Sequence, residues 1–233
     1  MSRSAIFDDP APRKGGVILL HGFASVPGTM WPLAYRLSRK GYATLVPFYP
    51  SWRLELDQII SWLQPQIAAF TEKQHDGPVH FIGHSMGGLV ARALIQRARP
   101  ANLGKLVMLG TPNGGSEIAD RLNDNRLLSR MILGNAAPAL ITRRDAKRIA
   151  MLGKLDYPAG IIAGNRAMID GPFSRQLPRP HDGKVSVAAT HAEGETDHVV
   201  LPLTHSTLPF HRSAQRQALH FLDHGCFRRS VAG

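Results

Sequence analysis

Six short apolar runs, separated by polar or amphipathic segments, are the feature that most constrains how this chain can fold. They are rich in Val, Ile and Leu and occupy residues 16–22, 43–48, 78–83, 104–111, 159–164 and 198–203. Continuous apolar strands that alternate with helices are typical of a parallel sheet covered on both faces. The pattern therefore predicts an α/β fold with a mostly parallel sheet of about six strands and helices on both faces.

Helices are expected between these runs, at residues 29–39, at 54–71, after Ser85 and at 212–224. In the second of them, apolar residues recur at helical spacing on one face. Residues 113–158, between the fourth and fifth runs, are too many for a plain crossover, so we expect a small helical cap insertion there. The sequence predicts one α/β domain over residues 1–233, with 113–158 as its cap.

The charge distribution indicates which kinds of partner to expect. The net charge is +11, but the basic residues are scattered, and in the densest part, residues 121–154, they alternate with acids and apolar residues. This pattern favours a solvated helix face, and no nucleic-acid partner is expected.

A single cysteine, Cys226, excludes an internal disulfide, and no metal-ligand spacing is present. No run is long enough to cross a bilayer and no secretory signal is seen, so we expect a cytoplasmic protein.

The segment GHSMG, residues 83–87, fits the pattern G-x-S-x-G and lies between a predicted strand and a predicted helix. In this context the pattern predicts a sharp turn that holds Ser85 at its apex as a nucleophile. Gly83 and Gly87 are expected because side chains there would collide with the neighbouring backbone. Packing alone would not select glycines at the start of a helix.

A serine nucleophile needs a histidine base and an acid that orients it. On a turn of this kind the chain order is serine, acid, histidine, with the histidine between the last strand and the last helix. His205 has that position, and His198 and His211 are its competitors. The candidate acids are Asp170, Asp182, Glu193, Glu195 and Asp197. Asp182 is preferred because it lies in a glycine-containing turn before a β-branched run, and Asp170 is the runner-up.

Two backbone N–H groups are expected to form an oxyanion hole near Ser85. One belongs to Met86, the residue after the nucleophile, at the start of a helix. The other is expected from Phe23, in the loop after the first strand, where Gly22 permits an unusual turn.

The segments LLHGF, GHSMGG, LGTPNGGS, DGKVSV and THS, in this order, resemble the α/β-hydrolase superfamily, and most closely its bacterial serine esterases and lipases. The resemblance covers residues 16–222. It implies a catalytic triad of Ser85, Asp182 and His205, an oxyanion hole from Phe23 and Met86, and no cofactor or metal.

The chain departs from this family's pattern in two places. It begins almost at the first parallel strand, so the antiparallel strands that often open this fold are expected to be missing. Nearly twenty residues also separate the fifth strand from Asp182, where the family commonly places the acid directly after the strand.

The expected function is hydrolysis of carboxylic esters through an acyl-enzyme, with a small-molecule ester or a lipid as the substrate. We also expect that the protein can contact a lipid surface peripherally. Two alternatives stay open. The same triad serves thioesterases, acyltransferases and amidases, and a hydrolase fold can also act as a binding protein without catalysis.

Overall fold

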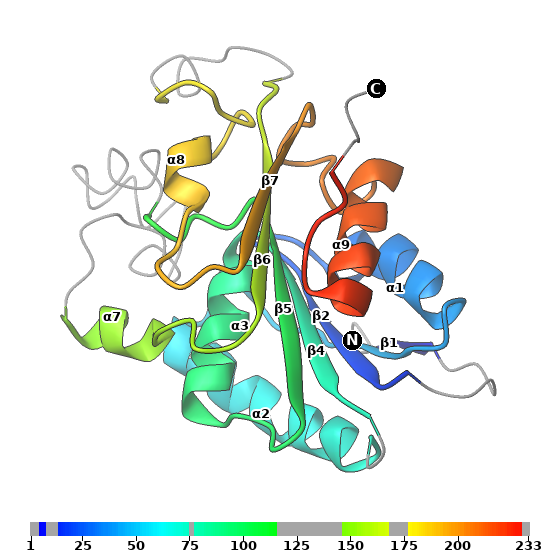
Figure 1. The fold of residues 1–233 in the computed structure, drawn as a ribbon. Coiled ribbons are helices and arrows are strands. Elements are labelled where there is room, and N and C mark those ends of the chain that lie inside the picture. The colour runs from blue at the N-terminus through cyan, green and yellow to red at the C-terminus, as the bar shows by residue number, and fades with distance from the viewer. Residues whose placement is uncertain (1–4, 8–13, 75–76, 116–145, 168–176, 230–233) are drawn as a thin grey trace.

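The computed structural model describes residues 5–7, 14–74, 77–115, 146–167 and 177–229, which form one layered α/β unit (Figure 1). Its strands are β1 (Ala5–Phe7), β2 (Gly16–Leu20), β3 (Ala43–Val46), β4 (Val79–His84), β5 (Leu103–Leu109), β6 (Ala159–Gly164) and β7 (Asp197–Leu201). Its helices are η1 (Pro27–Thr29), α1 (Trp31–Ser38), α2 (Leu56–Glu72), α3 (Met86–Arg97), α7 (Ala146–Leu152), α8 (Val187–Thr190) and α9 (Arg212–His224).

The strands form one sheet in the order β1-β3-β2-β4-β5-β6-β7. All neighbouring pairs from β3 to β7 are parallel, which confirms the predicted mostly parallel sheet. β4 is central, and all six of its residues are buried. Because the carboxyl ends of parallel strands share one edge, the residues that follow β2, β4, β5, β6 and β7 meet there.

The expectation that the sheet lacks an opening antiparallel strand is wrong. β1 pairs antiparallel with β3, with Ala5 opposite Val46. It has only three residues, and a run of that length gives no readable alternation of apolar and polar positions. The sheet therefore has six parallel strands and one short antiparallel strand at its edge.

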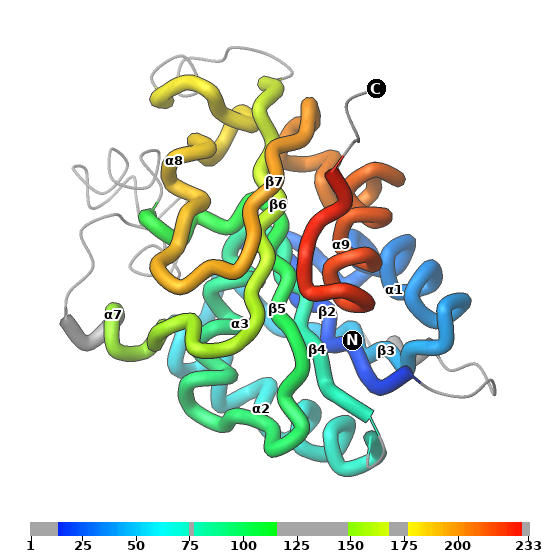
Figure 2. The backbone as a smooth tube through the Cα atoms, viewed as in Figure 1, coloured from blue at the N-terminus to red at the C-terminus, as the bar shows by residue number. Residues whose placement is uncertain are grey.

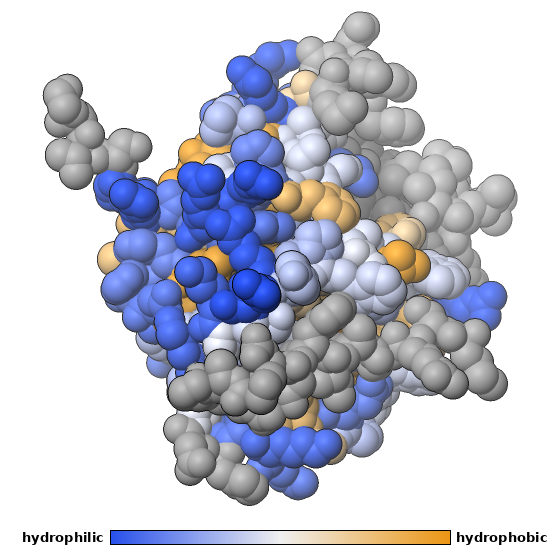
Figure 3. Space-filling model, turned by 90° about the vertical axis from the view of Figure 1, so that its right-hand side faces the viewer, coloured by the Kyte–Doolittle hydropathy of each residue, from blue (hydrophilic) through white to orange (hydrophobic). Residues whose placement is uncertain are grey.

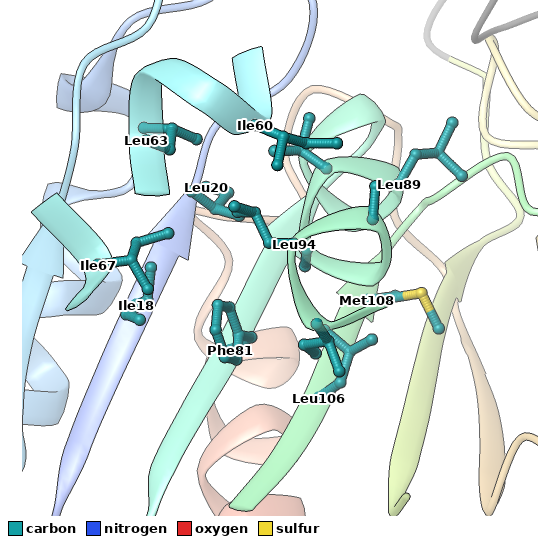
Figure 4. Close-up of a cluster of buried hydrophobic side chains, with 14 of the residues drawn as sticks. Ile18, Leu20, Ile60, Leu63, Ile67, Phe81, Leu89, Leu94, Leu106 and Met108 are labelled. Atoms are coloured by element: carbon teal, nitrogen blue, oxygen red, sulfur yellow. The ribbon is translucent and has the colours of Figure 1, made fainter. Parts of the chain in front are cut away.

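Helices cover both faces of the sheet, as predicted (Figure 2). On one face α2, α3 and α7 bury apolar side chains in a cluster with the strands, and Figure 4 shows helix residues such as Ile67 and Leu94 beside Ile18 and Phe81 of the sheet. On the other face α1 and α9 cover a second cluster that includes Leu33, Leu37, Ala214, Ala218 and Phe221. Apolar burial on both faces provides most of the stabilisation of such a sheet.

The predicted cap, residues 113–158, is described only at its two ends. Residues 116–145 lie outside the described part of the chain, and α7 begins at Ala146 and packs against α3. The cap therefore stays a prediction. Among the helices that the structure describes, none has the length and apolar character required to cross a membrane.

Candidate active site

Ser85 occupies the turn between the central strand β4 and helix α3 and has a strained backbone. Its φ is 54° and its ψ is −125°, a conformation that non-glycine residues rarely adopt. The Ser85 N–H donates to Leu109 O at 2.8 Å, and Ser85 O accepts from Gly88 N and from Thr111 Oγ1, both at 3.0 Å. The strained turn is thus fixed from both sides, while the Ser85 side chain stays partly exposed.

The glycines around Ser85 are required by close backbone contacts. A Cβ atom on Gly83 would lie 2.4 Å from Gly88 N, and one on Gly87 would lie 2.2 Å from Leu20 O. Contacts this short with backbone atoms cannot be relieved by rotating a side chain. The steric reason inferred from the sequence is therefore present in the structure.

Asp182 and His205 are brought together by a short hydrogen bond. His205 Nδ1 lies 2.7 Å from Asp182 Oδ2, and both residues are buried. The other carboxylate oxygen, Oδ1, accepts from the backbone N–H groups of Lys184 at 2.9 Å and Val185 at 2.8 Å. The His205 N–H also donates to Asp182 O at 2.9 Å. The carboxylate thus accepts two backbone N–H groups on Oδ1 and lies against the His205 ring through Oδ2, and these contacts fix its orientation.

The Asp182–His205 pair lies over the carboxyl ends of β5 and β6. A Cβ atom on Gly110, directly after β5, would lie 3.1 Å from Asp182 Oδ2 and 3.2 Å from His205 Nδ1. A Cβ atom on Gly164, the last residue of β6, would lie 2.8 Å from Asp182 Cβ. The loop after β6 therefore returns Asp182 to the end of that strand, which explains the long gap in the sequence.

No hydrogen bond joins Ser85 Oγ to the His205 ring within the described part of the chain. Serine–histidine contacts are often loose until substrate binds. The two residues nevertheless lie at neighbouring strand ends, because Ser85 is bonded to Leu109 of β5 and the pair lies over Gly110.

The loop after β2, which carries the predicted oxyanion donor Phe23, is held against the nucleophile. A Cβ atom on Gly22 would lie 3.1 Å from Ser85 Cβ. Tyr49 Oη donates to His21 O, and Ser51 Oγ donates to Gly22 O at 3.2 Å. Met86, the second predicted donor, is the first residue of α3. The backbone around both N–H groups is thus fixed beside Ser85, and their role as an oxyanion hole stays a prediction.

Several solved structures share this architecture. A lipase of Bacillus licheniformis, BlEst2 in its mature form, superposes with a TM-score of 0.70 at 17% sequence identity, covering 95% of this chain and 97% of that one. An α/β-hydrolase enzyme from the metagenome of lagoon sediments at Mar Chica, Morocco, MGS-MChE2, gives a TM-score of 0.58 at 19% identity, covering 93% and 92%. The chain has the α/β-hydrolase fold.

A third protein with the α/β-hydrolase fold is the type II thioesterase BorB from the borrelidin biosynthetic cluster. It gives a TM-score of 0.57 at 20% identity and covers 98% of this chain and 99% of that one. The family model described as a domain of unknown function, DUF7379, matches residues 58–157, which include Ser85 and helix α3. No curated protein matches the sequence.

His84 supports the His205 loop of this α/β-hydrolase fold, a role that was not predicted from the sequence. Its Nε2–H donates to His205 O at 3.0 Å, and the two ring centres are 5.0 Å apart. Burial lowers the pKa of His84 to about 3, and the charge of the nearby His205 ring acts in the same direction. His84 is therefore neutral and links the nucleophile turn to the backbone of His205. No sequence signal could reveal a contact between residues 121 positions apart.

The competing histidines and acids have other partners. His198 Nε2 lies 2.9 Å from Thr190 Oγ1, and His211 begins helix α9 by accepting from Ser213 N. Glu195 binds His191 at 2.6 Å, and Asp197 is paired with Arg229. Glu193 is exposed. Asp170 lies outside the described residues. Within the described ranges, no group of three histidine, cysteine or acidic residues could hold a metal ion.

Proposed function

We propose that this chain is a serine hydrolase that cleaves carboxylic esters through an acyl-enzyme. The observation that carries the proposal is the buried hydrogen bond between Asp182 and His205, beside a strained and partly exposed Ser85. A serine hydroxyl is a weak nucleophile until a neighbouring base takes its proton. A histidine held by a buried carboxylate at the adjacent strand ends supplies that base.

In the first half-reaction His205 Nε2 takes the proton of Ser85 Oγ while Oγ attacks the ester carbonyl carbon. Asp182 accepts from Nδ1–H, which fixes the tautomer and stabilises the imidazolium that forms. The N–H groups of Phe23 and Met86 stabilise the negative charge on the carbonyl oxygen. When the tetrahedral intermediate collapses, the ester C–O bond breaks and the leaving alcohol takes the proton from His205.

In the second half-reaction water hydrolyses the acyl-enzyme. His205 takes a proton from the water molecule, whose oxygen attacks the acyl carbon. The bond between that carbon and Ser85 Oγ then breaks, Ser85 recovers its proton from His205, and the carboxylic acid leaves. No step requires a metal ion, so full activity is expected in the presence of EDTA.

The test is hydrolysis of nitrophenyl esters from acetate to palmitate by the purified protein and by Ser85→Ala. We expect turnover by the natural chain and a loss of about 10³-fold or more in kcat for the variant. Ser206→Ala is the matched control, because Ser206 is an exposed serine next to His205. Its activity should stay within about 3-fold of the natural chain. Absence of turnover at every chain length, or full activity of Ser85→Ala, would contradict the proposal.

The same assay separates esters from the other bonds that this triad can cleave. One acyl group presented as an ester, a thioester and an amide gives three values of kcat/KM. The proposal predicts that the ester value is the highest. A higher thioester value would assign the site to thioester chemistry, for which the thioesterase BorB has a comparable fold.

A further inference from the structure

The outer surface of helices α1 and α9 carries three large aromatic side chains that face solvent. Trp31 is 45% exposed, Tyr35 is 58% exposed and Phe210, just before α9, is 46% exposed. Single exposed apolar residues are normal, but bulky aromatic ones gathered on one face mark an interaction surface. We call the surface formed by the solvent sides of α1 and α9 the α1–α9 face.

The two segments that carry these aromatic residues are neighbours in space. Helices α1 and α9 lie side by side on the same face of the sheet (Figures 1 and 2). Gln215 of α9 joins them, because its Oε1 accepts from Arg36 at 3.5 Å and its Nε2 donates to Phe210 O at 3.3 Å. Trp31 and Tyr35 are one helical turn apart on α1 and precede Arg36.

Basic residues are carried by the same two helices and the residues directly after α1. They are Arg36 of α1, Arg39 and Lys40 directly after it, and Arg212 and Arg216 of α9. The only acid in either helix is Asp223, which is already bonded to Lys14 at 3.0 Å and to Tyr42 at 2.9 Å. Figure 3 looks onto this side of the molecule, and hydrophilic side chains cover much of it. The α1–α9 face is therefore positively charged and is complementary to an anionic partner.

The α1–α9 face also adjoins the edge of the sheet where the candidate active site lies. The loop that carries His205 leads through Phe210 into α9, and the loop that carries Phe23 leads through η1 into α1. Both helices thus begin at the edge where Ser85 lies. A partner bound to their first turns would hold its surface next to that edge.

We propose that the α1–α9 face docks on the surface of an anionic phospholipid membrane. Tryptophan, tyrosine and phenylalanine side chains enter the boundary between headgroups and acyl chains, and arginine and lysine are attracted to anionic headgroups. The face presents both kinds of side chain, as peripheral membrane proteins do. This inference goes beyond the proposed hydrolysis, because binding does not require turnover.

The experiment measures sedimentation of the Ser85→Ala protein with vesicles, so that no lipid is hydrolysed. The vesicles contain phosphatidylcholine alone or an equimolar mixture of phosphatidylcholine and phosphatidylglycerol. We expect binding to the anionic vesicles, weak or no binding to the neutral ones, and a decrease as salt is added, because salt screens the attraction.

Two sets of substitutions, added to Ser85→Ala, test the face itself. Two variants should each weaken binding to anionic vesicles about 10-fold or more. The first carries Trp31→Ser and Phe210→Ser, and the second carries Arg39→Gln, Arg212→Gln and Arg216→Gln. The controls away from this face are Trp62→Ser on α2, where Trp62 is 49% exposed, and Lys73→Gln with Arg97→Gln at the ends of α2 and α3. The controls should bind as Ser85→Ala does.

Three results would overturn the docking proposal. They are equal binding to neutral and anionic vesicles, no binding to either, and equal losses in the control and test variants. Binding to an oligonucleotide but not to vesicles would assign the face to nucleic acid instead. Circular dichroism verifies that each variant is folded. Hydrolysis of a water-soluble nitrophenyl ester, measured for the same substitutions with Ser85 intact, tests the proposed function separately and should not change.

Discussion

At the scale of single residues, the chemistry of the site depends on contacts between distant parts of the chain. Chain order and turn residues were enough to select Ser85, Asp182 and His205 from the sequence, and the structure brings Asp182 and His205 within 2.7 Å of each other. The support from His84 could not be predicted, because it depends on how two loops approach each other across the sheet edge. The order of residues in the sequence thus predicts which side chains come together, but not the contacts that hold them in position.

Asp182→Asn tests the orienting role of the carboxylate. An asparagine amide can present its N–H to Nδ1 and thereby favour the wrong imidazole tautomer, so kcat should fall by about 10³- to 10⁴-fold with little change in KM. Steady-state kinetics on one nitrophenyl ester measures both constants. Glu193→Gln, at an exposed acid of the same region, is the control and should resemble the natural chain. A fall of less than about 10-fold for Asp182→Asn would remove Asp182 from the proposed triad.

At the scale of secondary-structure elements, the long and regular ones were predictable and the short ones were not. Helix α9 spans Arg212–His224, and the predicted range was the same. Its apolar residues repeat over three turns, so the helical period can be read from the sequence. Strand β1 has three residues and helix α8 has four, and neither is long enough to show a period. The position of Asp182 beside Gly164, at the end of β6, could not be predicted either, because it depends on the tertiary structure.

One buried side chain, Arg92, ties helix α3 to the two neighbouring segments. Its guanidinium donates to Asn113 Oδ1 at 2.9 Å, after β5, and to Gly153 O at 2.8 Å, after α7. Both acceptors lose this partner in Arg92→Met, which should lower the free energy of unfolding by about 2–4 kcal/mol. Urea denaturation measures this change. Arg97→Met, at an exposed arginine of the same helix, should change the free energy by less than about 1 kcal/mol. Equal changes in the free energy of unfolding for the two substitutions would contradict the stabilising role of Arg92.

At the scale of the whole molecule, buried neutral histidines make stability depend on pH. Burial lowers the pKa of His21 to about 4, of His80 to about 4 and of His84 to about 3. In the unfolded chain these rings titrate near pH 6.5. Between about pH 6.5 and 4 the unfolded state therefore binds more protons than the folded state, and the free energy of unfolding must fall as pH falls.

Urea denaturation at pH 7 and pH 5 tests this dependence. Each of the three histidines should lower the free energy of unfolding by about 2 kcal/mol over that interval. His80→Asn should reduce the loss, because asparagine can still accept the Lys105 N–H that His80 Nδ1 accepts at 2.9 Å but does not titrate. His211→Asn, at an exposed position, should leave the loss unchanged. Equal stability of the natural chain at the two pH values would contradict the prediction.

The most direct test of the account is covalent labelling of the nucleophile by a fluorophosphonate, followed by mass spectrometry of the digested protein. One phosphonyl adduct, on Ser85, is expected to form rapidly in the natural chain. Labelling of His205→Asn, in which the base is missing, is expected to be much slower. Rapid labelling of another serine, or labelling of Ser85 at the same rate in both proteins, would contradict the claim that His205 activates Ser85.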